Sequence, residues 1–247
     1  MAITSMRAFL AGAVLMACAG IAIAGQGRGT GDDGTPAAIA ARGADRGGKH
    51  GDGATSHRRF DDVEHWKSVF DDPARDEWQK PDELVGALGL QPGMNVADIG
   101  AGTGYLSRRL SAAVGEQGTV FVVEVEPNLV EHMRDRAEAE KTANVVPVLG
   151  SKDNPRLPAS SIDVALFVDA YHHIDARRQY LAVLKRSLRP GARVAIVEWK
   201  AGKQPVGPQD EDHKLAREKV LEEMRAAGFE QVPTDDFLPH QYFLMFR

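Results

Sequence analysis

The stretch VADIGAGTGYL, residues 96–106, decides how the fold of this chain is interpreted. A short apolar run ends at Ile99, and glycines then occupy every second position, at Gly100, Gly102 and Gly104. A helix is predicted directly after them. Glycines allow a tight turn and a close approach of the backbone to a ligand. The stretch therefore predicts a nucleotide-binding loop at the end of a buried strand.

The spacing of the glycines distinguishes between kinds of nucleotide loop. A dinucleotide-binding loop reads G-x-G-x-x-G, but counting from Gly100 the sixth position is Tyr105. The phosphate-binding pattern G-x-x-x-x-G-K-[ST] is absent as well. The loop therefore departs from both phosphate-binding patterns, which disfavours a nicotinamide-dependent reductase.

Apolar strands alternate with helices on both sides of this loop. Strands are expected at 95–99, 119–125, 144–149, 161–169, 192–199 and 242–246, and helices at 81–88, 105–114, 127–140, 175–188 and 211–227. Almost wholly apolar strands that alternate with helices predict a parallel sheet covered on both faces. The predicted fold class is therefore α/β, a doubly wound, mainly parallel sheet. A helical cap at residues 60–90 precedes it.

Residues 1–24 have the pattern of a secretory signal peptide, with Arg7 followed by an apolar stretch too short for a comfortable membrane span. Two processing sites compete. Signal peptidase would cut at AIAG, residues 22–25, whereas LMAC, residues 15–18, resembles a lipobox that would place a lipid on Cys18. We expect an exported protein, periplasmic or lipid-anchored, and a cytoplasmic one if the signal is not used.

Residues 25–59 are rich in glycine and contain almost no large apolar side chain. Such a composition buries too little surface to offset the entropy of ordering, so a disordered linker is predicted there. The folded domain is then expected to span residues 60–247.

Composition excludes several kinds of partner. The net charge of −5 argues against binding of nucleic acid. The single cysteine, Cys18, excludes an internal disulfide framework and a cysteine-cluster metal site. No metal is expected from Asp169, His172 and His173, because adjacent histidines usually point in divergent directions. Membrane attachment is expected only through a lipid on Cys18, and the sequence does not indicate an oligomeric state.

Further motifs follow the glycine loop in order. VFVVEVEP (120–127) contains Glu124, SKDNPRLP (151–158) follows the third strand, SIDVALFVDAYHHI (161–174) contains the fourth strand, and LRPGARVAIVEW (188–199) contains the fifth. Glu124 lies about two dozen residues after the loop, near the interval expected for an acid that binds a ribose. A carboxylate is the natural acceptor for the two hydroxyls of a ribose.

Together with DIGAGTGYL, these motifs resemble the class I S-adenosylmethionine-dependent methyltransferases of the small-molecule type, over residues 81–247. The resemblance implies a seven-stranded Rossmann-like sheet and S-adenosylmethionine as cofactor. It implies the following cofactor-binding residues: Asp98, Gly100, Ala101, Gly102, Gly104, Glu124, Asp153 and Asn154. Asp98 can support the loop or hold the methionine moiety. Ala192 departs from the family pattern, which has a glycine there.

Candidate catalytic residues follow the fourth strand: Asp169, Tyr171, His172 and His173. Methyl transfer from a sulfonium depends mainly on positioning, and a base is needed only if the acceptor atom carries a proton that must leave. Histidine suits that role, and Asp169 can orient either the base or the acceptor. The alternative is that one histidine caps or packs against the next helix.

The sequence thus predicts S-adenosylmethionine-dependent methyl transfer to a small-molecule acceptor. A non-catalytic S-adenosylmethionine- or nucleoside-binding sensor or scaffold stays open, because an exported enzyme needs a supply of a cytoplasmic cofactor. The cap carries Trp66 and Trp78, which can pack simply or cover the acceptor pocket. RDEWQKP, residues 75–81, has more polar groups than a packing face needs, which favours a lid.

Overall fold

The computed structural model describes residues 62–247, and within them one seven-stranded sheet has the order β3-β2-β1-β4-β5-β7-β6. The strands are β1 (Asn95–Ile99), β2 (Thr119–Glu124), β3 (Val145–Leu149), β4 (Ile162–Val168), β5 (Leu188–Trp199), β6 (Gln231–Val232) and β7 (Gln241–Phe246). β1 to β5 pair in parallel, and β7 runs antiparallel to β5. The predicted doubly wound, mainly parallel fold is confirmed. The predicted signal peptide (1–24) and linker (25–59) lie outside the described residues.

Helices cover both faces of the sheet. They are α1 (Val63–Phe70), α2 (Arg75–Gln79), α3 (Pro81–Ala87), α4 (Ser107–Val114), α5 (Pro127–Ala139), α6 (Arg177–Ser187) and α7 (Arg217–Ala226), with short 3-10 turns η1 (Tyr171–His173) and η2 (Glu211–His213). One core cluster joins the sheet to α3, α4 and α5, and a second joins its other face to α6 and α7. Successive side chains of a strand point to opposite faces of the sheet, so alternate strand residues belong to one core cluster or the other.

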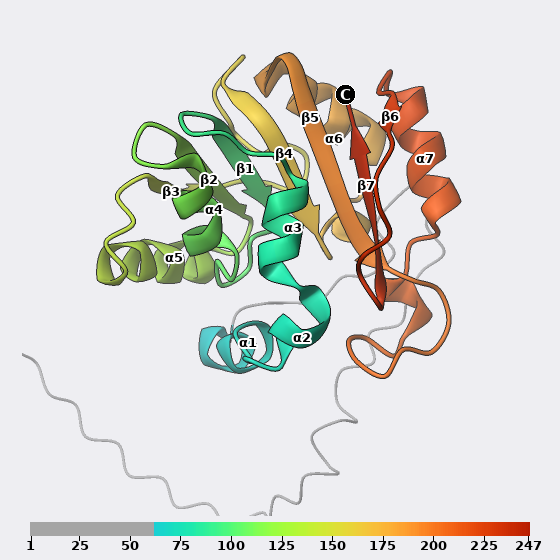
Figure 1. Cartoon of the computed structure of the whole chain (residues 1–247), viewed down its shortest axis with the longest axis horizontal. Coiled ribbons are helices and arrows are strands. Elements are labelled where there is room, and N and C mark those ends of the chain that lie inside the picture. Colours follow the sequence, from blue (N-terminus) through green and yellow to red (C-terminus); the bar gives the residue numbers. More distant parts are fainter. Residues whose placement is uncertain (1–61) are drawn as a thin grey trace, which may run out of the picture. The chain divides into compact units, whose positions relative to one another are not determined.

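The strand order reverses between β1 and β4, because β2 and β3 extend the sheet on one side of β1 and β4 and β5 extend it on the other. In open α/β sheets the ligand site lies beyond the carboxyl ends of the strands at this reversal. Figure 1 shows α1 and α2, the first two helices of the predicted cap (60–90), below these strand ends. The cap is therefore next to the expected site.

The predicted helix over residues 211–227 is wrong in its first part. Only η2 and, after a break, α7 are helical there. The chain is extended at Lys214 and Ala216, and the Tyr242 hydroxyl donates to the Leu215 carbonyl oxygen at 2.8 Å. Leu215 is buried, and the extended backbone on either side of it separates η2 from α7. The fifth strand also begins earlier than expected, at Leu188 and not at Ala192.

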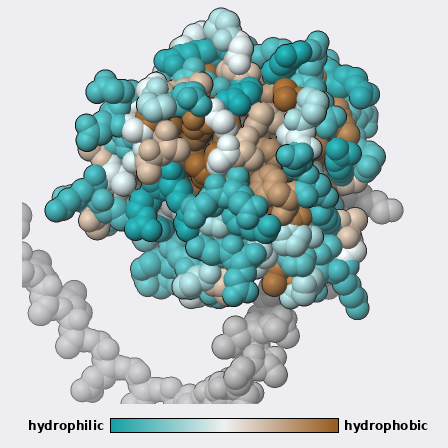
Figure 2. Space-filling view, viewed as in Figure 1, coloured by the Kyte–Doolittle hydropathy of each residue, from teal (hydrophilic) through white to brown (hydrophobic). Residues whose placement is uncertain are grey.

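The surface of the described part is largely hydrophilic at its rim, with hydrophobic side chains showing in the middle of the face seen in Figure 2. The exposed large hydrophobic side chains are Val69, Val125, Val146 and Leu149. Two of them, Val125 and Leu149, lie at the carboxyl ends of β2 and β3. Among the described helices, none has the length and apolar character needed to cross a membrane.

Candidate functional site

The glycine loop is fastened to the end of the neighbouring strand. The amides of Gly100 and Ala101 both donate to the Val123 carbonyl oxygen, at 2.8 and 3.2 Å. Val123 is the partner of Ile99 in the β1–β2 register. The loop therefore lies across the carboxyl ends of β1 and β2.

Two of the three loop glycines are required by contacts within the protein. A Cβ on Gly100 would lie 2.5 Å from the Ala170 Cβ, and one on Gly104 would lie 2.7 Å from the Ser107 hydroxyl. Gly102 differs, because a Cβ there would meet the Phe70 ring of α1 at 3.2 Å. The cap thus covers the loop at Gly102.

Glu124 ends β2 with its carboxylate turned to the loop. It accepts hydrogen bonds from the amides of Gly102 (3.0 Å), Val125 (2.6 Å) and Glu126 (3.4 Å). Burial raises the pKa of Glu124, and these three amides oppose the rise. The sequence-predicted ribose acid therefore lies against the sequence-predicted loop.

The segment after β3 is a tight turn beside Glu124. The Gly150 amide donates to the Glu124 carbonyl oxygen at 2.8 Å, and Ser151 and Asn154 form a short bridge. Asp153 accepts from the Ser151 hydroxyl at 2.6 Å. Glu124 and Leu149 are partners in the β2–β3 register. The turn that carries Asp153 and Asn154 therefore borders the same strand ends.

Asp98 is buried at the end of β1. Burial and the neighbouring Glu124 raise its pKa to about 7, although Arg75 opposes the rise. Among the described residues, the Asp98 carboxylate takes no hydrogen bond from the glycine loop, in contrast to Glu124. The arrangement favours the second of its two predicted roles, contact with a bound molecule, over support of the loop.

Arg75 of α2 is a site residue that sequence analysis did not single out. Its guanidinium lies 4.1 Å from the centroid of the Tyr105 ring and interacts electrostatically with Asp169 and Asp98. It also donates to the Phe70 carbonyl oxygen at 3.1 Å. Its position in the polar stretch 75–81 is the feature of the sequence that could have indicated it.

Ion pairs and hydrogen bonds hold the cap on the glycine loop. Arg136 of α5 binds the Asp71 carboxylate at 2.9 Å and the Thr103 carbonyl oxygen at 3.1 Å. The Tyr105 hydroxyl donates to Asp76, which also pairs with Arg109 at 2.8 Å. The region predicted as a lid is therefore tied to the loop in this structure.

A row of buried glutamines connects the cap to Asp169. Gln79 of α2 donates to the Gln241 side-chain oxygen at 2.7 Å, and Gln241 donates to Asp169 Oδ1 at 2.6 Å. Burial and the neighbouring Glu198 raise the pKa of Asp169 to about 8, against the opposing effect of Arg75. Polar side chains from α2, β4 and β7 thus meet at one place.

His172 is paired with a buried carboxylate that sequence analysis missed. Its Nδ1 lies 2.7 Å from Glu198 Oε2, and its amide donates to Glu198 Oε1 at 3.0 Å. Burial lowers the pKa of His172 to about 3, so the imidazole is neutral at pH 7. The signal for Glu198 was an acid inside an otherwise apolar strand.

Tyr171 does not join the other candidates. Its side chain is buried in the core against Phe167, at 5.6 Å between ring centroids, and its hydroxyl donates to Glu223 of α7 at 3.0 Å. Arg177 pairs with the same Glu223 carboxylate at 2.8 Å. This geometry gives Tyr171 a packing position, in place of the predicted catalytic one.

Comparison with known proteins agrees with this geometry. Residues 96–191 match the family model described as a methyltransferase domain. Two relatives are both named ubiquinone/menaquinone biosynthesis C-methyltransferase UbiE: the protein from Ectopseudomonas mendocina is 28% identical over 119 residues, and that from Laribacter hongkongensis is 28% identical over 124 residues. The matches cover 48% and 50% of this chain and 46% and 50% of the relatives. The chain therefore spans about half the length of the curated relatives that it matches.

Solved structures extend the likeness to most of the described part. A SAM-dependent methyltransferase from Aquifex aeolicus has a TM-score of 0.70 and 26% identity, covering 75% of this chain and 97% of that one. The 1,6-didemethyltoxoflavin-N1-methyltransferase of Burkholderia thailandensis, with S-adenosylhomocysteine bound, has a TM-score of 0.56 and 22% identity, covering 75% and 83%. The second likeness concerns the fold alone.

Proposed function

We propose that this chain, which carries a class I S-adenosylmethionine-dependent methyltransferase domain, transfers a methyl group from that cofactor to a small-molecule acceptor. S-adenosylmethionine is the cofactor of this class. The observation that carries the proposal is the buried Glu124 carboxylate, held beside the glycine loop at the reversal of strand order. An acid in that place suits the two hydroxyls of a ribose.

The residues around Glu124 fit the rest of the cofactor. The exposed apolar side chains of Val125 and Leu149 flank the strand ends, where an adenine ring can cover them. The methionine part carries an ammonium, which the Asp98 carboxylate can bind, and a carboxylate, which the Arg75 guanidinium can bind. Bound there, the cofactor supplies an electrophilic methyl group, and the chain contributes binding, orientation and exclusion of water.

The acceptor is proposed to be small and partly apolar or aromatic. Asp169 and His172 follow β4, and Ala170 between them lies against the glycine loop, so they can orient an acceptor there. The ring of Trp78 in the cap packs at a tilt of 41° against Trp199 at the end of β5, with ring centroids 5.0 Å apart. The UbiE relatives are named for ubiquinone/menaquinone biosynthesis, which supports an acceptor of this kind.

Calorimetry with the purified chain tests the proposal. S-adenosylmethionine and S-adenosylhomocysteine are expected to bind in the micromolar range, and NADH is expected not to bind. A chain that binds neither of the first two contradicts the proposal. To separate an enzyme from a sensor, S-adenosylhomocysteine release is then measured with a panel of small phenols, quinols and amines. If no acceptor raises the release of S-adenosylhomocysteine above the rate without acceptor, the result favours a sensor.

Replacing Glu124 with alanine is expected to weaken binding of the cofactor by about 1–3 kcal/mol, or about 5- to 150-fold in the dissociation constant. The physical reason is the loss of hydrogen bonds to a buried charged acceptor. Calorimetry measures the change. Glu138→Ala, at an exposed position of α5, is the matched control and should bind as the wild type does. An unchanged dissociation constant for Glu124→Ala would remove this residue from the site.

The affinity for S-adenosylmethionine is expected to fall as the pH drops below 7. The pKa of Asp98 is raised to about 7, so below that pH the carboxyl is largely protonated. A cationic ligand binds the ionised form, and each pH unit below 7 then costs up to about tenfold in affinity. Adenosine, which lacks the methionine part, should show no such dependence, and Asp98→Asn should abolish it. If the affinity of the wild type for S-adenosylmethionine changes with pH as little as its affinity for adenosine, the result argues against the assignment of Asp98.

We also propose export, from the signal-peptide pattern of residues 1–24. Lipidation at Cys18 and cleavage before Gly25 are the two processing routes that this pattern supports.

A further inference from the structure

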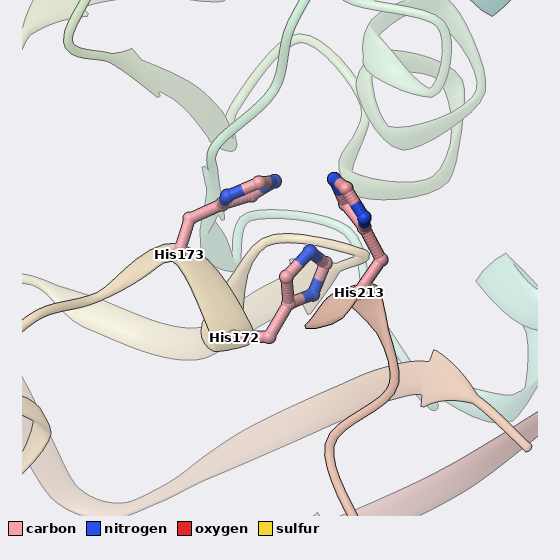
Figure 3. A group of neighbouring side chains, drawn as sticks. All are labelled: His172, His173 and His213. Carbon is pink, nitrogen blue, oxygen red and sulfur yellow. The ribbon is translucent and has the colours of Figure 1, made fainter. Parts of the chain in front are cut away.

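Three histidines come together beside the proposed acceptor position. His172 and His173 lie on η1, and His213 comes from η2, about 40 residues further along the chain. One ring nitrogen of each lies within 4.8 Å of those of the other two. Figure 3 shows the three rings turned toward one another. The prediction that adjacent histidines diverge is therefore wrong for this pair.

The rings of the two adjacent histidines lie side by side on η1. Their ring centroids lie 4.0 Å apart, with an interplanar angle of 41°. The His213 ring lies 5.6 Å from that of His172 and 5.8 Å from that of His173, nearly perpendicular to both. Three nitrogens bound to one tetrahedral metal lie about 3.3 Å apart, from bond lengths of about 2.0–2.1 Å. Small side-chain rotations close the present spacing to that value.

Glu198 fixes the orientation of the His172 ring. Its carboxylate oxygen lies 2.7 Å from His172 Nδ1 and leaves Nε2 as the atom that can bind a metal. Metal-binding histidines in proteins almost always have such a partner on the other ring nitrogen, often a carboxylate. The second Glu198 oxygen accepts from the His172 amide at 3.0 Å, which fixes η1 as well.

The surrounding charges are compatible with a cation. Arg177 is the nearby guanidinium, and its charge is balanced by Glu223 through contacts of 2.8 and 3.1 Å. Lys214, next to His213, directs its ammonium to the Gly202 carbonyl oxygen at 2.8 Å and to Glu211 at 2.9 Å. Each of the two cations thus has a carboxylate partner of its own, although the Arg177 charge still acts on His172. His173 and His213 are only partly buried, which leaves the cluster open to a further ligand.

We propose that His172, His173 and His213 bind a divalent transition metal, Zn²⁺ in the first place, with Glu198 supporting His172 and one coordination position open to an oxygen of the acceptor. Three imidazoles with an open fourth position are a known ligand set for catalytic zinc, and imidazole nitrogen suits zinc, copper, iron and nickel.

The role of the metal rests on the proposed function, whereas the site itself does not. An acceptor hydroxyl on the metal loses its proton to water more readily, because the cation stabilises the oxyanion. The oxygen then forms the bond to the methyl carbon, and the carbon–sulfur bond breaks. Its electron pair stays on sulfur, which yields S-adenosylhomocysteine. The metal would thus replace a protein base.

The test is direct metal binding to the full chain. The chain is stripped with a chelator and titrated with ZnCl2 in a calorimeter, and with Co²⁺ followed by visible absorption. The wild type is expected to bind about one metal per chain and to give the absorption of a tetrahedral cobalt site. His213→Ala is expected to lose at least about 100-fold in affinity, and Glu198→Gln about 10- to 100-fold.

The controls separate this site from adventitious binding and from misfolding. His65→Ala, at an exposed position of α1, should bind the metal as the wild type does. His213→Gln, which keeps much of the side-chain volume, should lose affinity like His213→Ala while keeping the wild-type unfolding temperature. Equal metal binding by the wild type and both His213 variants overturns the site, as does no binding by the wild type.

Calorimetry with S-adenosylmethionine on the same samples separates the two proposals. Metal binding without cofactor binding supports the metal site and contradicts the proposed function. Cofactor binding without metal binding overturns the metal site alone.

Discussion

Replacing Glu223 with alanine is expected to lower the free energy of unfolding by about 3–5 kcal/mol, the cost of breaking a buried ion pair from one side. Glu223 accepts from Arg177 Nε at 2.8 Å and Nη2 at 3.1 Å, and from the Tyr171 hydroxyl at 3.0 Å. Both donors belong to largely buried residues. Without the carboxylate, a buried guanidinium loses its counter-charge and a buried hydroxyl loses its acceptor.

Denaturant unfolding of the variant measures this loss. Glu222→Ala is the matched control, because its neighbouring carboxylate on α7 is 71% exposed and lies 3.6 Å from Lys219. An exposed pair of this kind contributes about 0–1 kcal/mol. Equal losses in the two variants would show that the Arg177–Glu223 pair does not stabilise the fold. The result bears on function, since Glu223 also binds Tyr171 of η1, the turn that carries His172.

Replacing Gly100 with alanine is expected to cost about 2–5 kcal/mol in the free energy of unfolding. The backbone at Gly100 has a φ of +75°, where an L-residue pays about 1–2 kcal/mol. The new Cβ would also lie 2.5 Å from the Ala170 Cβ, and such overpacking costs about 1–3 kcal/mol more. Because Ala170 precedes η1, the clash also shifts the segment that carries the histidines.

Two further variants separate the contributions. Gly93→Ala has a φ of +88° with no atom within 4 Å of the new Cβ, so it should show the backbone cost alone. Combining Gly100→Ala with Ala170→Gly removes the clash and should recover the overpacking part. If Gly93→Ala loses as much stability as Gly100→Ala, and the double variant recovers nothing, the contact with Ala170 is not what requires a glycine there.

Much of the candidate site could be predicted because it lies at the ends of strands. Asp98, Glu124 and Asp169 each follow a readable apolar run, and the ends of parallel strands meet at one edge of the sheet. Tyr171 followed the same logic, yet its side chain turns into the core toward α7. The direction of a side chain in a turn after a strand depends on packing, which the local pattern does not contain.

By itself, the sequence determined the fold class, the strands that carry the site, and the cofactor loop with its acid. Those features are local, because hydrophobic periodicity and glycine spacing act over a few residues. Only the tertiary structure decided that Arg75, Gln79, Gln241, Glu198 and His213 join the site. They lie on α2, β5, β7 and η2, which come together only in the folded chain, and their charges and hydrogen bonds become partners only when the core is packed.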